Sequence, residues 1–148
     1  MHLNDELPEL TGRLTIELFD DGGKLKDFRE IENLVVTTGK NWWAARGTNA
    51  PPAAMSHMAV GAGAVAPLLG DLTLGGELGR VALASQTTLG NVTTYAAGFG
   101  KGIGTGAVTE AAIFNDPAAG TMLNRATFPV VNKGANDTMT ITWAVTQN

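Results

Sequence analysis

A strict alternation of apolar and polar residues near the C-terminus most constrains how this chain can fold. Over residues 138–146, four large apolar side chains alternate with threonines and one alanine. The apolar set is Met139, Ile141, Trp143 and Val145. A period of two places the two sets on opposite faces of a β-strand and does not fit a helix. Residues 13–19 alternate in the same way, with Leu14, Ile16 and Leu18 on one face.

Comparable apolar segments recur along the chain, separated by turns rich in Gly, Asn and Asp. The predicted strands cover residues 13–19, 24–36, 55–61, 79–88, 92–99, 107–114, 121–131 and 138–146. Residues 72–78 fit either a strand or a helical turn, and residues 37–47 predict one short helix that a threonine caps and Gly47 ends. Short, regularly spaced strands predict an all-β fold, an antiparallel β-sandwich or a jelly-roll-like barrel. We expect an irregular N-terminal arm over residues 1–12 and a single domain over residues 13–148.

Composition excludes several functional classes. The chain has no Cys, two His and a net charge of −4. Without Cys there is no disulfide framework and no thiol nucleophile, and an acidic chain lacks the basic stripe of a nucleic-acid binder. No apolar run reaches the roughly 18 residues of a membrane span. We therefore expect no catalytic residue, cofactor, metal, nucleic-acid, membrane or small-molecule substrate site.

The charges are unevenly distributed along the chain. Residues 1–46 hold nine acids and six bases, whereas the much longer remainder holds five acids and four bases. A folded domain normally places charges on its solvent-facing surface. The charge-poor remainder therefore either faces other protein or forms a solvated Thr/Asn surface, and the sequence leaves both open.

Three charges lie within otherwise apolar predicted strands: Arg80, Glu110 and Arg125. Because a buried charge needs a partner, we expect a structural ion pair among them between neighbouring strands. Residues 61–66 also fit the pattern G-x-G-x-x-A of dinucleotide sites. That pattern requires a βαβ context, which is missing here, so we expect no nucleotide.

Two groups of apolar residues are candidates for an interface. Trp42 and Trp43 are adjacent on the predicted helix, so they point about 100° apart; we expect one to fill the core and the other to anchor a partner. Leu3, Leu7 and Leu10 are the apolar residues of the predicted arm, which we expect to dock on a neighbour.

The order of several short segments resembles a group of small tailed-bacteriophage virion proteins. The segments are Asn33–Asn41, Ala59–Gly63, Leu72–Arg80, Thr109–Asn115, Gly120–Phe128, Val131–Lys133 and Thr140–Trp143. The chain is also distantly similar to the N-terminal attachment domain of tail-collar fibre proteins. Their E-x-G-[LI]-F element appears here as Glu110–Phe114, with Ala112 where Gly is usual.

The resemblance implies a β-sandwich-like virion protein without enzymatic activity. On that basis we expect a capsid decoration, or cement, protein: a homo-oligomer in the virion that binds the major capsid protein. An alternative is a tail or baseplate subunit that attaches or adapts a fibre. A third, from another class, is a surface glycan-binding module in which Trp42 or Trp43 stacks on a sugar.

Overall fold

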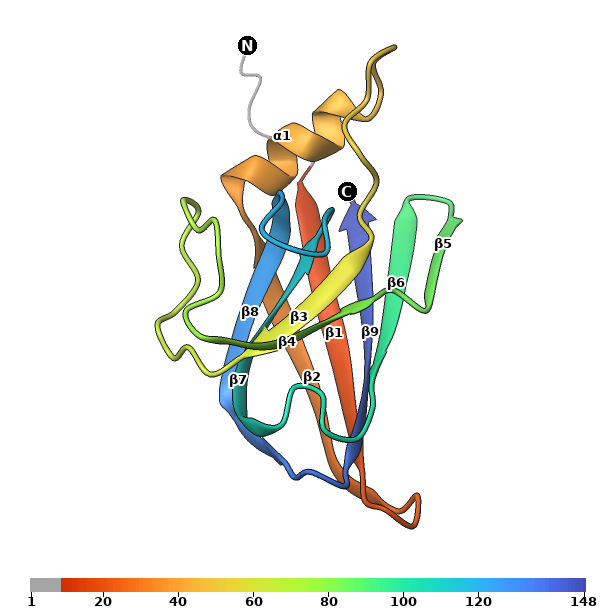
Figure 1. The fold of residues 1–148 in the computed structure, drawn as a ribbon. Coiled ribbons are helices and arrows are strands. Elements are labelled where there is room, and N and C mark those ends of the chain that lie inside the picture. Colours follow the sequence, from red (N-terminus) through yellow and green to blue (C-terminus); the bar gives the residue numbers. More distant parts are fainter. Residues whose placement is uncertain (1–8) are drawn as a thin grey trace.

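The computed structural model describes residues 9–148 and contains, within that range, nine β-strands and one helix (Figure 1). The strands are β1 (Leu10–Phe19), β2 (Leu25–Val35), β3 (His57–Gly61), β4 (Glu77–Ala82), β5 (Ser85–Leu89), β6 (Val92–Phe99), β7 (Gly106–Phe114), β8 (Met122–Lys133) and β9 (Thr138–Gln147). The helix is α1 (Thr37–Ala45). The predicted all-β class with one short helix is confirmed.

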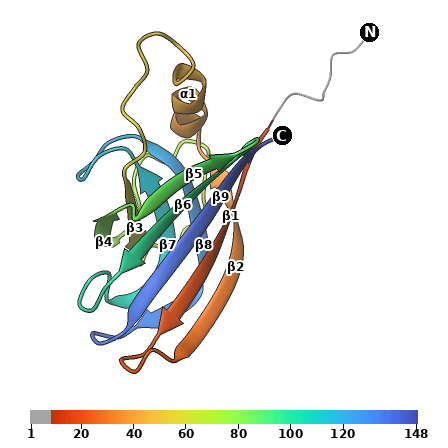
Figure 2. The ribbon, with the colours of Figure 1, turned by 90° about the vertical axis from the view of Figure 1, so that its right-hand side faces the viewer.

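All strand pairs are antiparallel and form one curled sheet in the order β4-β3-β7-β8-β2-β1-β9-β6-β5 (Figure 2). The long strand β2 turns one corner of the curl, because it pairs with β1 as far as Asn33 and with β8 from Leu34. At the centre of the sheet, β1 pairs with β9 along its full length, from Leu10 opposite Gln147 to Phe19 opposite Thr138.

The two edges of the sheet are joined by a two-residue link. The Leu83 N–H donates to the Ser56 carbonyl at 2.9 Å, beside β3, and the Ala84 N–H donates to the Ala96 carbonyl at 2.7 Å, on β6. The chain thus steps from the β4 edge to the β5 edge. The single strand predicted over residues 79–88 is therefore wrong: its two halves pair with opposite ends of the sheet.

The hairpin between β1 and β2 turns at Asp20-Asp21-Gly22-Gly23, one of the Gly- and Asp-rich turns expected between strands. The Asp20 carboxylate accepts the backbone N–H groups of Gly22 and Lys24 at 3.0 and 2.9 Å. Gly23 has φ of 83°, a conformation that glycine adopts without the clash of a side chain. A register shift beside Leu18 leaves Lys26 as the extra residue of a β-bulge.

The main core lies inside the curl and follows the predicted alternation. Met139, Ile141, Trp143 and Val145 of β9 are all fully buried, as are Leu14 and Ile16 of β1. A second, smaller cluster lies on the outer side of β3 and β7. Its members are Val36, Ala59, Leu74, Ala112, Phe114 and Met122. The fold therefore buries both faces of β7, because the loop over residues 62–76 covers its outer face.

Helix α1 covers one end of the sheet (Figure 2) and is fixed by tertiary contacts rather than by a capping side chain. Val36, not a threonine, is the N-cap residue, and it makes no side-chain cap. Thr38 instead donates its hydroxyl to the Met122 carbonyl at 2.9 Å. Gly39 lies directly against β8, where an added Cβ would meet the Leu123 carbonyl oxygen at 1.9 Å.

Several predicted boundaries also need correction. Strand β1 begins at Leu10, so residues 10–12 belong to the sheet rather than to the predicted arm. Residues 72–76 are neither strand nor helix, because Gly75 and Gly76 bind the Glu110 side chain of β7, described below. Strand β3 begins two residues later than predicted, at His57.

We expect Gly39→Ala to lower the free energy of unfolding by about 1–3 kcal/mol, since the new methyl group forces α1 away from β8. Urea denaturation measures the change. Gly70→Ala is the matched control, because that position is exposed with open space around it. Equal destabilisation by both substitutions would show that the close approach of α1 to β8 is unimportant.

Candidate functional site

A buried carboxylate on β7 organises the longest irregular segment of the chain. Glu110 is fully buried, and its carboxylate accepts three backbone N–H groups: Gly63 at 2.7 Å, Gly75 at 2.8 Å and Gly76 at 2.8 Å. These donors lie at the two ends of residues 62–76. The segment forms a loop (Figure 1), hereafter the 62–76 loop, and the Glu110 side chain binds both of its ends.

Arg125 of β8 binds the same carboxylate and extends the network into the loop. Its Nε and Nη2 lie 3.1 and 3.0 Å from Glu110 Oε1. Its Nη1 donates to the Asp71 carboxylate at 3.0 Å, and its Nη2 also donates to the Val65 carbonyl at 2.9 Å. The predicted ion-pair residues Glu110 and Arg125 are thus brought together, and both are almost fully buried.

Two glycines are required by this approach, Gly61 at the end of β3 and Gly63 in the loop. A Cβ at Gly61 or at Gly63 would lie 2.5 Å from Glu110 Oε2. The two glycines of the G-x-G-x-x-A match at residues 61–66 are thus explained without a nucleotide, since they leave room for the Glu110 carboxylate.

The network sets the ionisation of Glu110. Burial alone raises the pKa of a carboxyl group, but here the N–H groups of Gly75, Gly76 and Gly63 and the Arg125 guanidinium outweigh it. Together they hold the pKa of Glu110 below its ordinary value of 4.5. The side chain therefore stays charged at neutral pH.

Arg80 binds neither Glu110 nor Arg125, so its inclusion in the predicted ion-pair set was wrong. It binds Glu77 at 2.8 Å and donates to the carbonyls of Asp116 and Ala119, each at 2.9 Å. Its guanidinium also lies 3.9 Å from the ring centroid of Phe114. Arg80 thus fastens the turn between β7 and β8, because its position on the edge strand β4 faces that turn rather than Glu110.

The 62–76 loop presents large apolar side chains to solvent. The exposed fractions are 72% for Val65, 62% for Leu68, 49% for Leu69 and 60% for Leu72. The backbone beneath them is held in place, because the Leu69 carbonyl accepts the Thr37 N–H at 2.9 Å and the Leu68 N–H donates to Asp71 at 2.9 Å. We call these four residues the apolar patch.

The two tryptophans divide as predicted between core and surface. Trp42 is 7% exposed and donates its indole N–H to the Ala53 carbonyl at 2.8 Å. Trp43 is partly exposed and donates to the Gln147 side chain at 3.1 Å. With Leu10, Trp43 lines a hollow of about 290 Å³ between α1 and β1. Leu3 and Leu7 lie outside the described residues.

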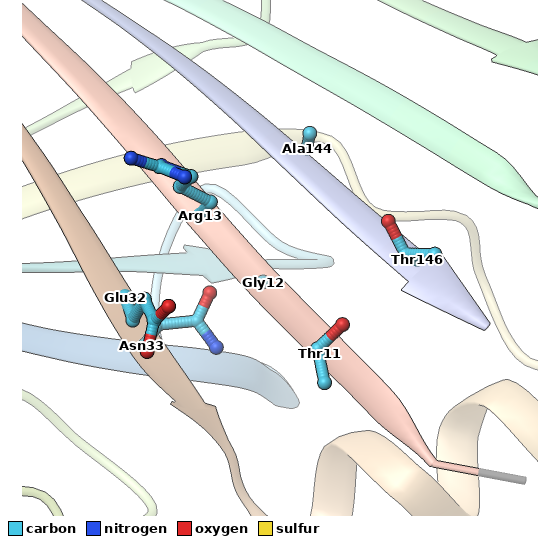
Figure 3. A pocket seen from close by; sticks show the side chains of 7 residues that line it. All are labelled: Thr11, Gly12, Arg13, Glu32, Asn33, Ala144 and Thr146. Carbon is cyan, nitrogen blue, oxygen red and sulfur yellow. The ribbon is translucent and has the colours of Figure 1, made fainter. Parts of the chain in front are cut away.

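A second hollow, of about 450 Å³, lies on the outer face of the sheet where β1, β2 and β9 run side by side (Figure 3). Its lining is Thr11, Gly12, Arg13, Glu32, Asn33, Ala144 and Thr146. The Arg13 guanidinium already binds Glu30 at 2.9 Å. The Asn33 side chain passes beside Gly12, and its oxygen accepts the indole N–H of the buried Trp143.

Within residues 9–148, no group of three His, Asp or Glu side chains is placed to hold a metal ion. Over the same range, no helix is long and apolar enough to cross a membrane. Comparison of the chain with protein-family models, curated proteins and solved structures gives no match.

The sequence analysis did not predict the apolar patch, nor that Asp71 helps to hold the backbone beneath it. The usable signal was four large apolar residues within residues 65–72, a stretch interrupted by Pro67 and Gly70 and without strand periodicity. Asp71 carried no signal, because its role depends on Arg125, which lies far along the chain.

We expect Glu110→Ala to lower the free energy of unfolding by roughly 3–5 kcal/mol, because it leaves the buried Arg125 guanidinium and three loop N–H groups without their acceptor. Chemical denaturation measures this. Glu77→Ala removes the more exposed carboxylate that binds Arg80 and is the control. A loss below about 0.5 kcal/mol for Glu110→Ala would contradict the role of the network.

The lowered pKa of Glu110 also predicts a pH dependence. Its ionic contribution to stability is fully present above the unfolded pKa of about 4.5 and is lost as pH falls through the lower folded pKa. The wild-type protein should therefore lose more unfolding free energy on acidification than Glu110→Gln does. The pKa of Asp137 is lowered too, by Lys26 and the Gly134 N–H, but Asp137 is common to both proteins. Parallel stability profiles between neutral pH and about pH 3 would refute the prediction.

Proposed function

We propose that this chain is a non-enzymatic structural protein of a tailed-phage virion, a capsid decoration protein that binds and stabilises the major capsid lattice. The observation that carries the proposal is the apolar patch on a backbone fixed from below by Glu110 and Arg125. Apolar side chains gathered on one exposed loop are typical of a protein-binding surface.

Anchoring of the loop favours binding energetically. A flexible loop would lose conformational entropy when it docks, whereas this loop is already ordered by five hydrogen bonds to the Glu110 and Arg125 side chains. A sixth bond, from the Leu68 N–H to the Asp71 carboxylate, is internal to the loop. More of the free energy of apolar burial is then available for attachment.

The outer face of β5, β6 and β9 supports the same proposal, because it belongs to the charge-poor part of the sequence. Alternation places on this face Ser85, Thr87, Leu89, Val92, Thr94, Ala96, Gly98, Thr138, Thr140, Thr142, Ala144 and Thr146. None of these side chains is charged. A face of short neutral side chains can approach another protein closely without burying a charge.

Copy number in purified virions tests the location. A decoration protein should be present in copies comparable with the major capsid protein, because it repeats with the symmetry of the shell. A handful of copies that remain with tails after the heads are removed would replace the proposal with a tail or baseplate subunit. Absence from virions would reject both.

The patch itself is tested by the double variant Val65→Ser/Leu68→Ser. Both side chains are exposed, so the free energy of unfolding should stay within about 0.5 kcal/mol of wild type. Binding to capsids that lack the protein should weaken about tenfold or more, because apolar burial at the contact is lost. Leu25→Ser, at a 47% exposed position on β2 outside both the patch and the neutral face, is the control. Unchanged capsid binding by the double variant would exclude the patch as the contact.

A further inference from the structure

A small pocket lies between α1 and the inner faces of β5 and β6, at the open end of the curled sheet. Its volume is about 190 Å³. The lining comprises Trp42, Trp43 and Arg46 from the helical segment and Gln86, Thr88, Thr93 and Tyr95 from the strands. The mouth of a curled sheet is a frequent position for ligand sites.

The pocket has aromatic walls. The rings of Trp42 and Trp43 lie edge to face, with centroids 6.0 Å apart and an interplanar angle of 67°. Tyr95, which is 1% exposed, contributes a third ring from β6. An aromatic face carries partial negative charge and attracts the C–H groups of a ring that lies on it.

Polar groups of the lining retain hydrogen-bonding capacity. Within residues 9–148, neither the Tyr95 hydroxyl nor the Gln86 side-chain oxygen has a hydrogen-bond partner, although the Gln86 amide nitrogen donates to the Met55 carbonyl at 3.1 Å. The hydroxyls of Thr88 and Thr93 are 3.1 Å apart and bond to each other. A ligand that enters the pocket thus meets several unused or shared polar groups.

The charge of the pocket is positive. Arg46 is the one charged residue in the lining, and its guanidinium lies 5.7 Å from the Trp42 ring centroid. Its Nη1 donates to the Pro52 carbonyl at 2.6 Å, which leaves its other N–H groups available within the described residues. Burial raises the pKa of Tyr95 to about 12, against the opposing effect of Arg46, so the phenol remains a proton donor at neutral pH.

We propose that this pocket binds one ring of an acidic sugar, such as a uronic acid at the end of a surface polysaccharide. Trp43, the more exposed of the two tryptophans, takes the apolar face of the ring, Arg46 takes the carboxylate, and Tyr95, Gln86 and the threonines take ring hydroxyls. The volume is below the roughly 300–1,000 Å³ of pockets for drug-sized ligands, so it suits one ring rather than a chain. Glycan binding goes beyond capsid attachment and uses a different surface.

The full-length protein can be titrated with glucuronic acid while amide chemical shifts are recorded. Glucose supplies the ring without the carboxylate, and acetate supplies the carboxylate without the ring. Glucuronic acid should bind and shift the α1, β5 and β6 resonances, and each of the other probes should bind about tenfold or more weakly. Equal binding of acetate and glucuronic acid would reduce the site to an anion contact, and no binding of glucuronic acid would overturn the proposal.

Variants at two positions, Arg46 and Tyr95, assign the roles of these side chains. Arg46→Gln should weaken glucuronic acid about tenfold or more while leaving the weak binding of glucose unchanged, and Arg46→Lys should recover part of the loss. Tyr95→Phe should weaken both sugars. Arg13→Gln, in the hollow on the outer face, is the matched control and should change neither.

Thermal unfolding verifies that each variant remains folded. Unchanged glucuronic acid binding by folded Arg46→Gln would overturn the assignment. None of these substitutions touches the apolar patch, so failure here leaves the virion copy number and capsid binding as an independent test of the proposed function.

Discussion

The structure depends on one buried carboxylate. Glu110 gathers three backbone N–H groups and a guanidinium around two oxygens, and each of these groups would carry a desolvation penalty without the others. Through Arg125 and Asp71 the same network holds the middle of the 62–76 loop. The loop in turn covers the outer side of β7, where Leu74 packs in the second apolar cluster. Removal of one charge therefore affects a polar network and a hydrophobic cluster together.

The network resembles an anion-binding site in which the bound anion is a side chain of the protein itself. Glycine-rich backbone commonly surrounds a phosphate, because the missing side chains let N–H groups reach the oxygens. Here Gly63, Gly75 and Gly76 perform the same task for a carboxylate that the chain supplies itself. These hydrogen bonds fix the conformation of the 62–76 loop, and the exposed outer side of the loop remains for contacts with other molecules.

Sequence patterns predicted the parts of the fold that local periodicity controls. Strand β6 and the buried face of β9 were predicted correctly, since alternation there needs only one buried face. The division of residues 79–88 between β4 and β5 was not predictable, because both halves read as strand and only the tertiary pairing separates them. Burial logic identified Glu110 and Arg125 as partners but could not exclude Arg80, whose partners lie on the turn after β7. The pocket beside Tyr95 also escaped prediction, because it joins α1 to strands more than forty residues later.

The central pairing of β1 with β9 has a consequence for how the protein is made. The first strand of the sheet finds one of its two neighbours only when the last strand has been synthesised. Until then the backbone groups along one edge of β1 lack their partners, and Leu14, Ile16 and Leu18 lack the neighbouring side chains of β9. Such non-local pairing slows folding and lengthens the time in which a nascent chain can aggregate.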